Sequence, residues 1–167
     1  MNINWSVLVP GPQGLLLPTY GNYGGPGYSN GEVLNPPDQP VDYSAPPVDG
    51  LDTLFRFHDM AYDTPDPLVR AEGDLALIRG IVELSAGPLP PEESLYAGGG
   101  ILAGIEQLTL ANGHPELASP GELLAAAGTA EQDIRYGLAH LEPADAAGLR
   151  LWAAETGHGS LGDFLLG

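Results

Sequence analysis

The chain has 167 residues, which is enough for one compact domain and hardly enough for two. Five basic residues, all of them arginine, stand against 22 acidic ones and give a formal net charge of −17. This charge argues against a nucleic-acid partner, because such binding depends on Lys and Arg neutralising phosphates. The chain contains no cysteine, which excludes disulfides, thiolate catalysis and cysteine-based zinc sites.

The first 48 or so residues are rich in Gly, Pro, Asn and Tyr, a composition that favours turns and irregular loops. Their apolar residues, Trp5, Leu8 and Leu15 to Leu17, can belong either to the core or to a rim that docks on a lipid aggregate. No apolar run reaches the roughly 18 residues that a membrane-spanning helix needs, and no basic leader is present. We therefore expect a secreted, mature form whose targeting segment has been removed, with a cytoplasmic location as the alternative.

From Asp49 onward the sequence predicts helices. Asp49 can cap a helix that runs to about Asp63, with apolar residues at helical spacing. A turn at 64–67 ends this helix, because two of its residues are proline. Further helices are expected at about 68–84, 92–111, 119–141 and 143–156, with one more turn around 161–166. The prediction is a mainly α, single domain over residues 1–167, built on an antiparallel helix pair, with additional helices over about 90–167.

Two segments carry residues suited to chemistry. A glycine-rich loop at 20–27 can bend so that several backbone carbonyl oxygens converge, and calcium prefers carbonyl oxygens combined with carboxylate. Asp59 on the following helix can supply that carboxylate. His58, its neighbour, projects about 100° away around the helix axis. One helix therefore offers a metal ligand and a general base on adjoining faces.

A general base needs a partner that fixes its tautomer. In an antiparallel hairpin of helices, residues equally distant from the turn lie at the same height, and this places Asp74 opposite His58. A lone carboxylate in the apolar stretch around Asp74 would be costly unless it were paired. The spacing therefore predicts a contact between His58 and Asp74, and Tyr62, one turn after His58, can bond the same carboxylate.

Together, segments 20–27 and 52–62 resemble the calcium loop and catalytic helix of secreted phospholipases A2. That family's loop reads Tyr-Gly-x-Tyr-Cys-Gly-x-Gly and its helix reads Asp-x-Cys-Cys-x-x-His-Asp-x-x-Tyr. Here Gly24 replaces the loop cysteine, and Leu54 and Phe55 replace the paired cysteines. The short gap between His58 and Asp74 leaves no room for the β-hairpin of animal members. This compactness and the His-Asp-x-Ala-Tyr form are similar to those of the cysteine-free phospholipase domains of parvovirus capsids and some microbial members.

The resemblance covers a catalytic core of about residues 20–84. It implies calcium-dependent hydrolysis of glycerophospholipid carboxylic esters to lysophospholipid and free fatty acid, at phospholipid aggregates or a membrane surface. His58 would activate water, with Asp74 and Tyr62 beside it, and the Gly25 amide would help to bind the oxyanion. The resemblance also implies a calcium ion held by the carbonyls of Tyr23, Gly25 and Gly27 and the carboxylate of Asp59.

Other interpretations of these residues remain open. The same scaffold can serve as a non-catalytic calcium- or lipid-binding module. A His-Asp pair on a helix is often purely structural. His114, His140 and His158 lack metal-ligand spacing and are expected to be surface or structural residues. Residues 157–162 superficially resemble a hydrolase serine turn, but a histidine occupies the position of its first glycine.

Overall fold

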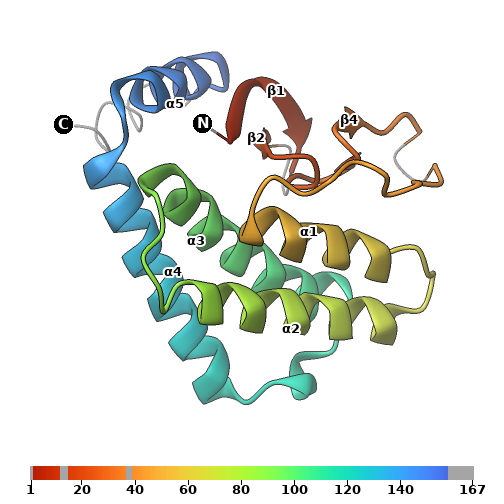
Figure 1. The fold of residues 1–167 in the computed structure, drawn as a ribbon. Coiled ribbons are helices and arrows are strands. Elements are labelled where there is room, and N and C mark those ends of the chain that lie inside the picture. The colour runs from red at the N-terminus through yellow and green to blue at the C-terminus, as the bar shows by residue number, and fades with distance from the viewer. Residues whose placement is uncertain (1, 12–14, 37–38, 158–167) are drawn as a thin grey trace.

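The computed structural model describes residues 2–11, 15–36 and 39–157 of the chain. Five α-helices follow two small β-hairpins, so the prediction of a mainly α protein is confirmed (Figure 1). The strands are β1 (Ile3–Pro10), β2 (Leu16–Tyr20), β3 (Tyr28–Ser29) and β4 (Glu32–Val33). The helices are α1 (Gly50–Ala61), α2 (Pro67–Leu84), α3 (Pro91–Glu106), the π-helical turn η2 (Gln107–Ala111), the 3₁₀ turn η3 (Pro115–Leu117), α4 (Pro120–His140) and α5 (Pro143–Glu155). The turn predicted at 161–166 lies outside the described residues.

The N-terminal hairpin corrects the expectation of irregular loops. Strand β1 pairs with β2 in antiparallel register, but the register shifts between Asn4 and Leu8. Pro10 and Pro18 also lie in these strands, which is tolerated because both strands of a two-stranded sheet are edge strands. The bulge and the prolines remove the regular alternation by which a strand is recognised from sequence.

Helices α1 and α2 form the antiparallel pair on which the site is built. Asp49 caps α1 by accepting from the Asp52 N–H, and Asp66 caps α2 by accepting from the Leu68 N–H. The helices approach closely at two glycines of α2, since a Cβ on Gly73 would lie 2.5 Å from the Ala61 Cβ and one on Gly80 would lie 2.6 Å from Leu54. Larger residues at these points would push the pair apart.

Helix α3 packs between α2 and α4 and completes the core. Within its glycine triplet, a Cβ on Gly98 would lie 2.7 Å from the Ala130 carbonyl of α4, and one on Gly100 would lie 3.0 Å from Ile81 of α2. Two of the three glycines therefore allow close helix contacts. Ile78, Ile81, Ile101 and Leu108 are almost fully buried here, and each such side chain contributes about 1.5–3 kcal/mol.

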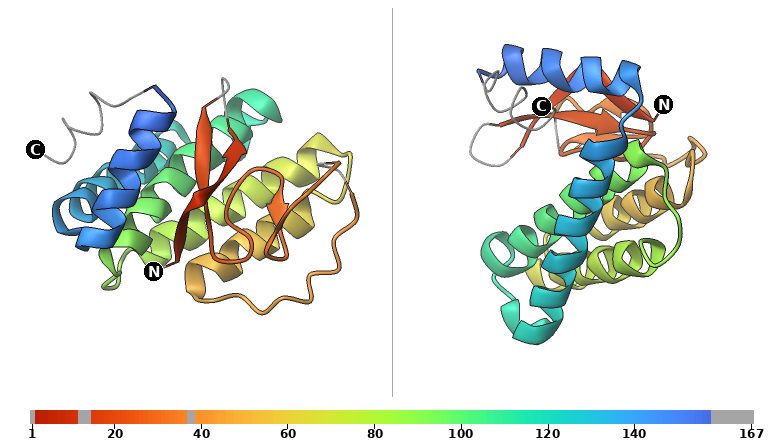
Figure 2. Two further views of the ribbon diagram at one scale, coloured as in Figure 1. Left: turned by 90° about the horizontal axis from the view of Figure 1, so that it is seen from above. Right: turned by 90° about the vertical axis from the view of Figure 1, so that its left-hand side faces the viewer.

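The β1–β2 hairpin and α5 lie on the same side of helices α1 to α3 (Figure 2). Trp5 donates its indole N–H to the buried Asp145 carboxylate of α5 at 2.9 Å, and Trp152 donates to the Leu16 carbonyl at 2.6 Å. Trp5 packs against the core, whereas Leu16 is 39% exposed. No helix among the described residues combines the length and apolarity needed to cross a bilayer.

Candidate active site

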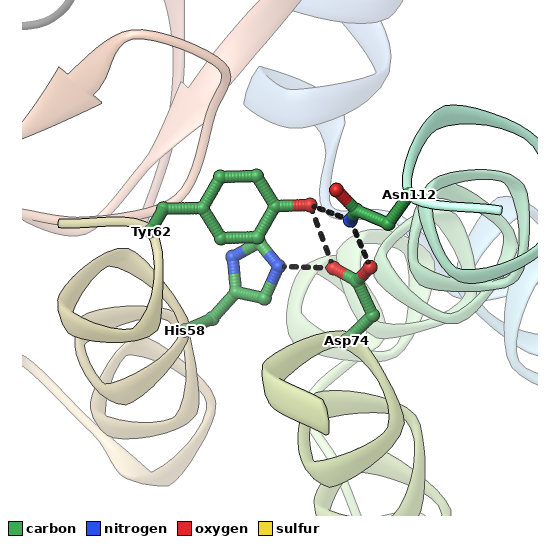
Figure 3. Close-up of polar contacts among 4 residues, drawn as sticks. All are labelled: His58, Tyr62, Asp74 and Asn112. Carbon is green, nitrogen blue, oxygen red and sulfur yellow. Dashed lines mark hydrogen bonds and ion pairs between the residues drawn. The ribbon is translucent and has the colours of Figure 1, made fainter. Parts of the chain in front are cut away.

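Four side chains from three elements form one hydrogen-bonded network (Figure 3). His58 Nε2 lies 2.8 Å from Asp74 Oδ1, and the Tyr62 hydroxyl donates to the same oxygen at 2.9 Å. Asn112 Nδ2 donates to Asp74 Oδ2 at 2.7 Å and to the Tyr62 hydroxyl oxygen at 2.9 Å. The contact expected between His58 and Asp74 is therefore present, and Tyr62 bonds the carboxylate as expected.

The surroundings of Asp74 make it a fixed acceptor for the imidazole. Its side chain is fully buried, whereas that of His58 is 12% exposed. A buried carboxylate with donors on both oxygens avoids the cost of an unpaired charge. His58 therefore carries its proton on Nε2, and Nδ1 has no hydrogen-bond partner among the described residues. An imidazole in this state can accept a proton at Nδ1 while Asp74 stabilises the resulting charge.

Asn112 is a site residue that sequence reasoning missed. The helix predicted over 92–111 changes at Glu106 into the π-helical turn η2, after which the Asn112 N–H donates to the Gln107 carbonyl. Such turns occur often at functional sites. They shift the following residues around the helix axis, and here Asn112 reaches Asp74. Asn112 followed by Gly113 reads in the sequence only as a helix end.

Replacing Asn112 with leucine is expected to destabilise the fold by about 1–3 kcal/mol, because Asp74 Oδ2 loses a donor in a buried position. Urea unfolding of the variant would measure this loss. Asn4 offers a matched control, since it is exposed and its side chain accepts only from the Ser6 N–H. Asn4→Leu should change stability by less than about 0.5 kcal/mol. Equal stability of the two variants would contradict the assigned role of Asn112.

The glycine loop is held against α1 and α3 by buried polar groups. The Asp52 carboxylate of α1 is fully buried and accepts from the backbone N–H groups of Asn22, Tyr23 and Val48 at 2.9–3.1 Å. Burial raises the pKa of Asp52, and these backbone donors oppose the rise. From α3, the Tyr96 hydroxyl lies 3.0 Å from the Gly24 carbonyl. The loop conformation is thus fixed by two helices.

Backbone groups of the loop retain capacity for a ligand. Gly25 and Gly27 have φ of +142° and +62°, a backbone conformation that favours glycine. Their carbonyls each accept one backbone N–H, from Tyr28 and Leu34, which leaves each oxygen a second lone pair. Within the described part of the chain, the Gly25 N–H donates to no backbone acceptor. It is therefore available to a bound oxyanion.

Asp59 has an unsatisfied oxygen, and its carboxyl lies beside Ser29, two residues after this loop. Asp59 Oδ2 is buried and has no hydrogen-bond partner among residues 2–11, 15–36 and 39–157, and the same is true of Ser29 Oγ beside it. Burial raises the pKa of Asp59 to about 8, and the Ser29 hydroxyl, which lies beside the carboxyl without forming a well-aligned hydrogen bond in the described structure, opposes part of this rise. A buried, unpartnered carboxylate oxygen with a hydroxyl beside it fits a cation. The described residues contain no group of three or more His, Cys, Asp or Glu side chains that could hold a metal, so backbone carbonyls would have to supply most ligands.

The remaining histidines lie apart from this network. The His114 ring bonds Glu116 at 2.8 Å, and the His140 ring bonds the Tyr136 carbonyl at 2.8 Å. Both have local partners, as expected of surface or structural residues. His158 and most of the serine-turn segment lie outside the described residues. Comparison with protein-family models, with curated proteins and with solved structures finds no match for this chain.

Proposed function

We propose that the chain is a calcium-dependent lipid hydrolase of the phospholipase A2 type, which cleaves carboxylic esters of glycerophospholipids. The main support is the pair of neighbouring residues His58 and Asp59 on helix α1. His58 is held through Nε2 by the buried Asp74, while the adjacent Asp59 has a buried oxygen that lacks a hydrogen-bond partner in the described part of the chain. A histidine paired only for structural reasons would not require this neighbour.

The arrangement of the core also supports this function. The antiparallel pair of α1 and α2, with the loop at 20–27 held against α1 by Asp52, is the arrangement that the resemblance to secreted phospholipases A2 implies. Helices α3 to α5 are additions to it. Helix α3 contributes Tyr96 and the end of η2 contributes Asn112 to the site, which gives the C-terminal half of the chain a role beyond packing.

Hydrolysis would begin with a water molecule bound to His58 Nδ1. The imidazole takes a proton from this water as its oxygen attacks the ester carbonyl, and Asp74 stabilises the imidazolium. The Gly25 N–H donates to the oxyanion of the tetrahedral intermediate. The C–O bond to glycerol then breaks, and the imidazolium returns its proton to the departing lysophospholipid alkoxide. The carboxylate of Asp59 and the carbonyls of Tyr23, Gly25 and Gly27 would hold calcium, which when bound supplies positive charge for the oxyanion and the substrate phosphate.

The test is release of fatty acid and lysophospholipid from zwitterionic phosphatidylcholine vesicles, with calcium or with a chelator. Zwitterionic lipid is chosen because a net charge of −17 repels the free protein from an anionic surface. Calcium-dependent appearance of both products would support the proposal. Calcium-dependent vesicle binding without product would instead identify a non-catalytic lipid-binding module.

Calcium affinity is expected to rise with pH up to about 8. Burial raises the pKa of Asp59 to about 8, so at lower pH a proton occupies the carboxylate that calcium needs. Binding must then displace this proton, and affinity should fall on the order of 10-fold per pH unit well below the pKa. Calorimetric titrations at pH 6 to 9, in buffers of different ionisation enthalpy, would measure affinity and proton release together. An affinity that is constant between pH 6 and 8 would contradict this prediction.

A further inference from the structure

Ser29 is the second unsatisfied oxygen beside Asp59. It is the last residue of β3, directly after the glycine loop, and its side chain is 2% exposed. Ser29 Oγ makes no hydrogen bond to any residue that the structure describes, although it is buried. Leaving a buried hydroxyl unpaired costs about 1–3 kcal/mol, so a fold that retains one must gain elsewhere.

The position of Ser29 links it to the same ligand as Asp59. Of the four buried side-chain polar atoms without a partner in the described part of the chain, these two oxygens lie next to each other. They come from different elements, since Ser29 belongs to β3 and Asp59 to α1. Two adjacent oxygens with unused lone pairs are satisfied together by one cation, and calcium accepts six to eight neutral or charged oxygen ligands.

We propose that the Ser29 hydroxyl is a direct calcium ligand in this chain, alongside Asp59 and the loop carbonyls. This inference rests on the proposed calcium site and adds to it a neutral side-chain ligand. The hydroxyl completes the coordination without adding negative charge next to Asp52 and Asp63, both of which already raise the pKa of Asp59. A Ser29 ligand also makes calcium binding sensitive to the position of β3, because both the loop and the strand that follows it would then contribute ligands to the ion.

Calorimetric titration of the full chain with calcium and with cadmium tests the assignment without measuring activity. Ser29→Ala should weaken calcium binding by about 10-fold, since it removes one ligand. Ser29→Cys should weaken calcium binding similarly but bind cadmium more tightly than the wild-type protein does, because a thiolate is a soft ligand. The wild-type chain has no cysteine, so the introduced thiol is the only one present.

Ser94→Ala is the matched control. Ser94 is also 2% exposed, but its hydroxyl bonds the Asp133 carbonyl at 3.1 Å within the helical core. This variant should lose stability without calcium and keep its calcium affinity, whereas Ser29→Ala should keep its calcium-free stability because no hydrogen bond is lost. Thermal unfolding in chelator separates the two variants.

Three outcomes overturn the inference. Unchanged calcium affinity in Ser29→Ala, with wild-type binding intact, removes Ser29 as a ligand and leaves the proposed function standing. Weaker calcium binding in Ser29→Cys without tighter cadmium binding assigns Ser29 a hydrogen bond to Asp59 instead. Absence of calcium binding in the wild-type protein refutes both this inference and the calcium site of the proposed function.

Discussion

Replacing His58 with alanine is expected to lower the rate of phospholipid hydrolysis by about 10²- to 10⁴-fold, the usual contribution of a general base. The loss follows from the geometry, since Nε2 is held by Asp74 and Nδ1 has no hydrogen-bond partner in the part of the chain that the structure describes. The fold should survive, because Asp74 keeps its hydrogen bonds from Tyr62 and Asn112. Initial rates of fatty-acid release, measured with saturating calcium, give the effect.

Two controls make this result specific. His140→Ala removes a histidine whose ring hydrogen-bonds the nearby Tyr136 carbonyl and stacks on the Tyr136 ring, and it should retain full activity. Calcium affinity of the His58→Ala variant should match that of the wild-type protein, because His58 is not among the proposed ligands. A folded His58→Ala protein with near-wild-type activity would contradict the assignment of His58 as the general base.

Replacing Asp59 with asparagine is expected to weaken calcium binding on the order of 100-fold or more, and activity should fall with it. The substitution keeps the size of the side chain and removes the only carboxylate of the proposed ligand set, so neutral oxygens alone would face a divalent ion. Calorimetry of both proteins at pH 8 to 9 measures the difference. Unchanged affinity would mean that any calcium ion binds elsewhere.

Without calcium, Asp59→Asn should stabilise the fold rather than weaken it. The pKa of Asp59 is about 8 in the folded chain and near 4 when unfolded, so the wild-type protein loses stability as pH rises from about 4 to 8. Asparagine carries no charge and escapes this loss, which amounts to on the order of a few kcal/mol. In chelator at pH 8 to 9, Asp59→Asn should therefore unfold at a higher temperature than the wild-type protein. A lower unfolding temperature would show that Asp59 stabilises the fold rather than serving a ligand.

Local chemistry explains which elements could be predicted. The helices α1, α2 and α4 begin where Asp49, Asp66 and Ser119 cap them, and each cap acts on a backbone N–H only two or three residues away. The β1–β2 hairpin was not predicted, because its register shift and its prolines disturb the pattern on which strand prediction depends. The break of the third helix at Glu106 was not predicted either, since a π-helical turn has no local signature in this sequence.

The sequence by itself determined how His58, Asp59, Tyr62 and Asp74 are placed relative to one another on α1 and α2. Helical geometry fixes which face of α1 each residue occupies, and the short turn before α2 fixes the height of Asp74. Simple spacing therefore predicts the contact between His58 and Asp74, although 16 residues of chain separate them. Only the tertiary structure decided which groups complete the site. Asn112 reaches Asp74 across 38 residues, and Ser29 meets Asp59 across two different elements. Contacts of this kind depend on how helices and strands pack, which is set by the fit of many buried side chains and glycines rather than by any local pattern.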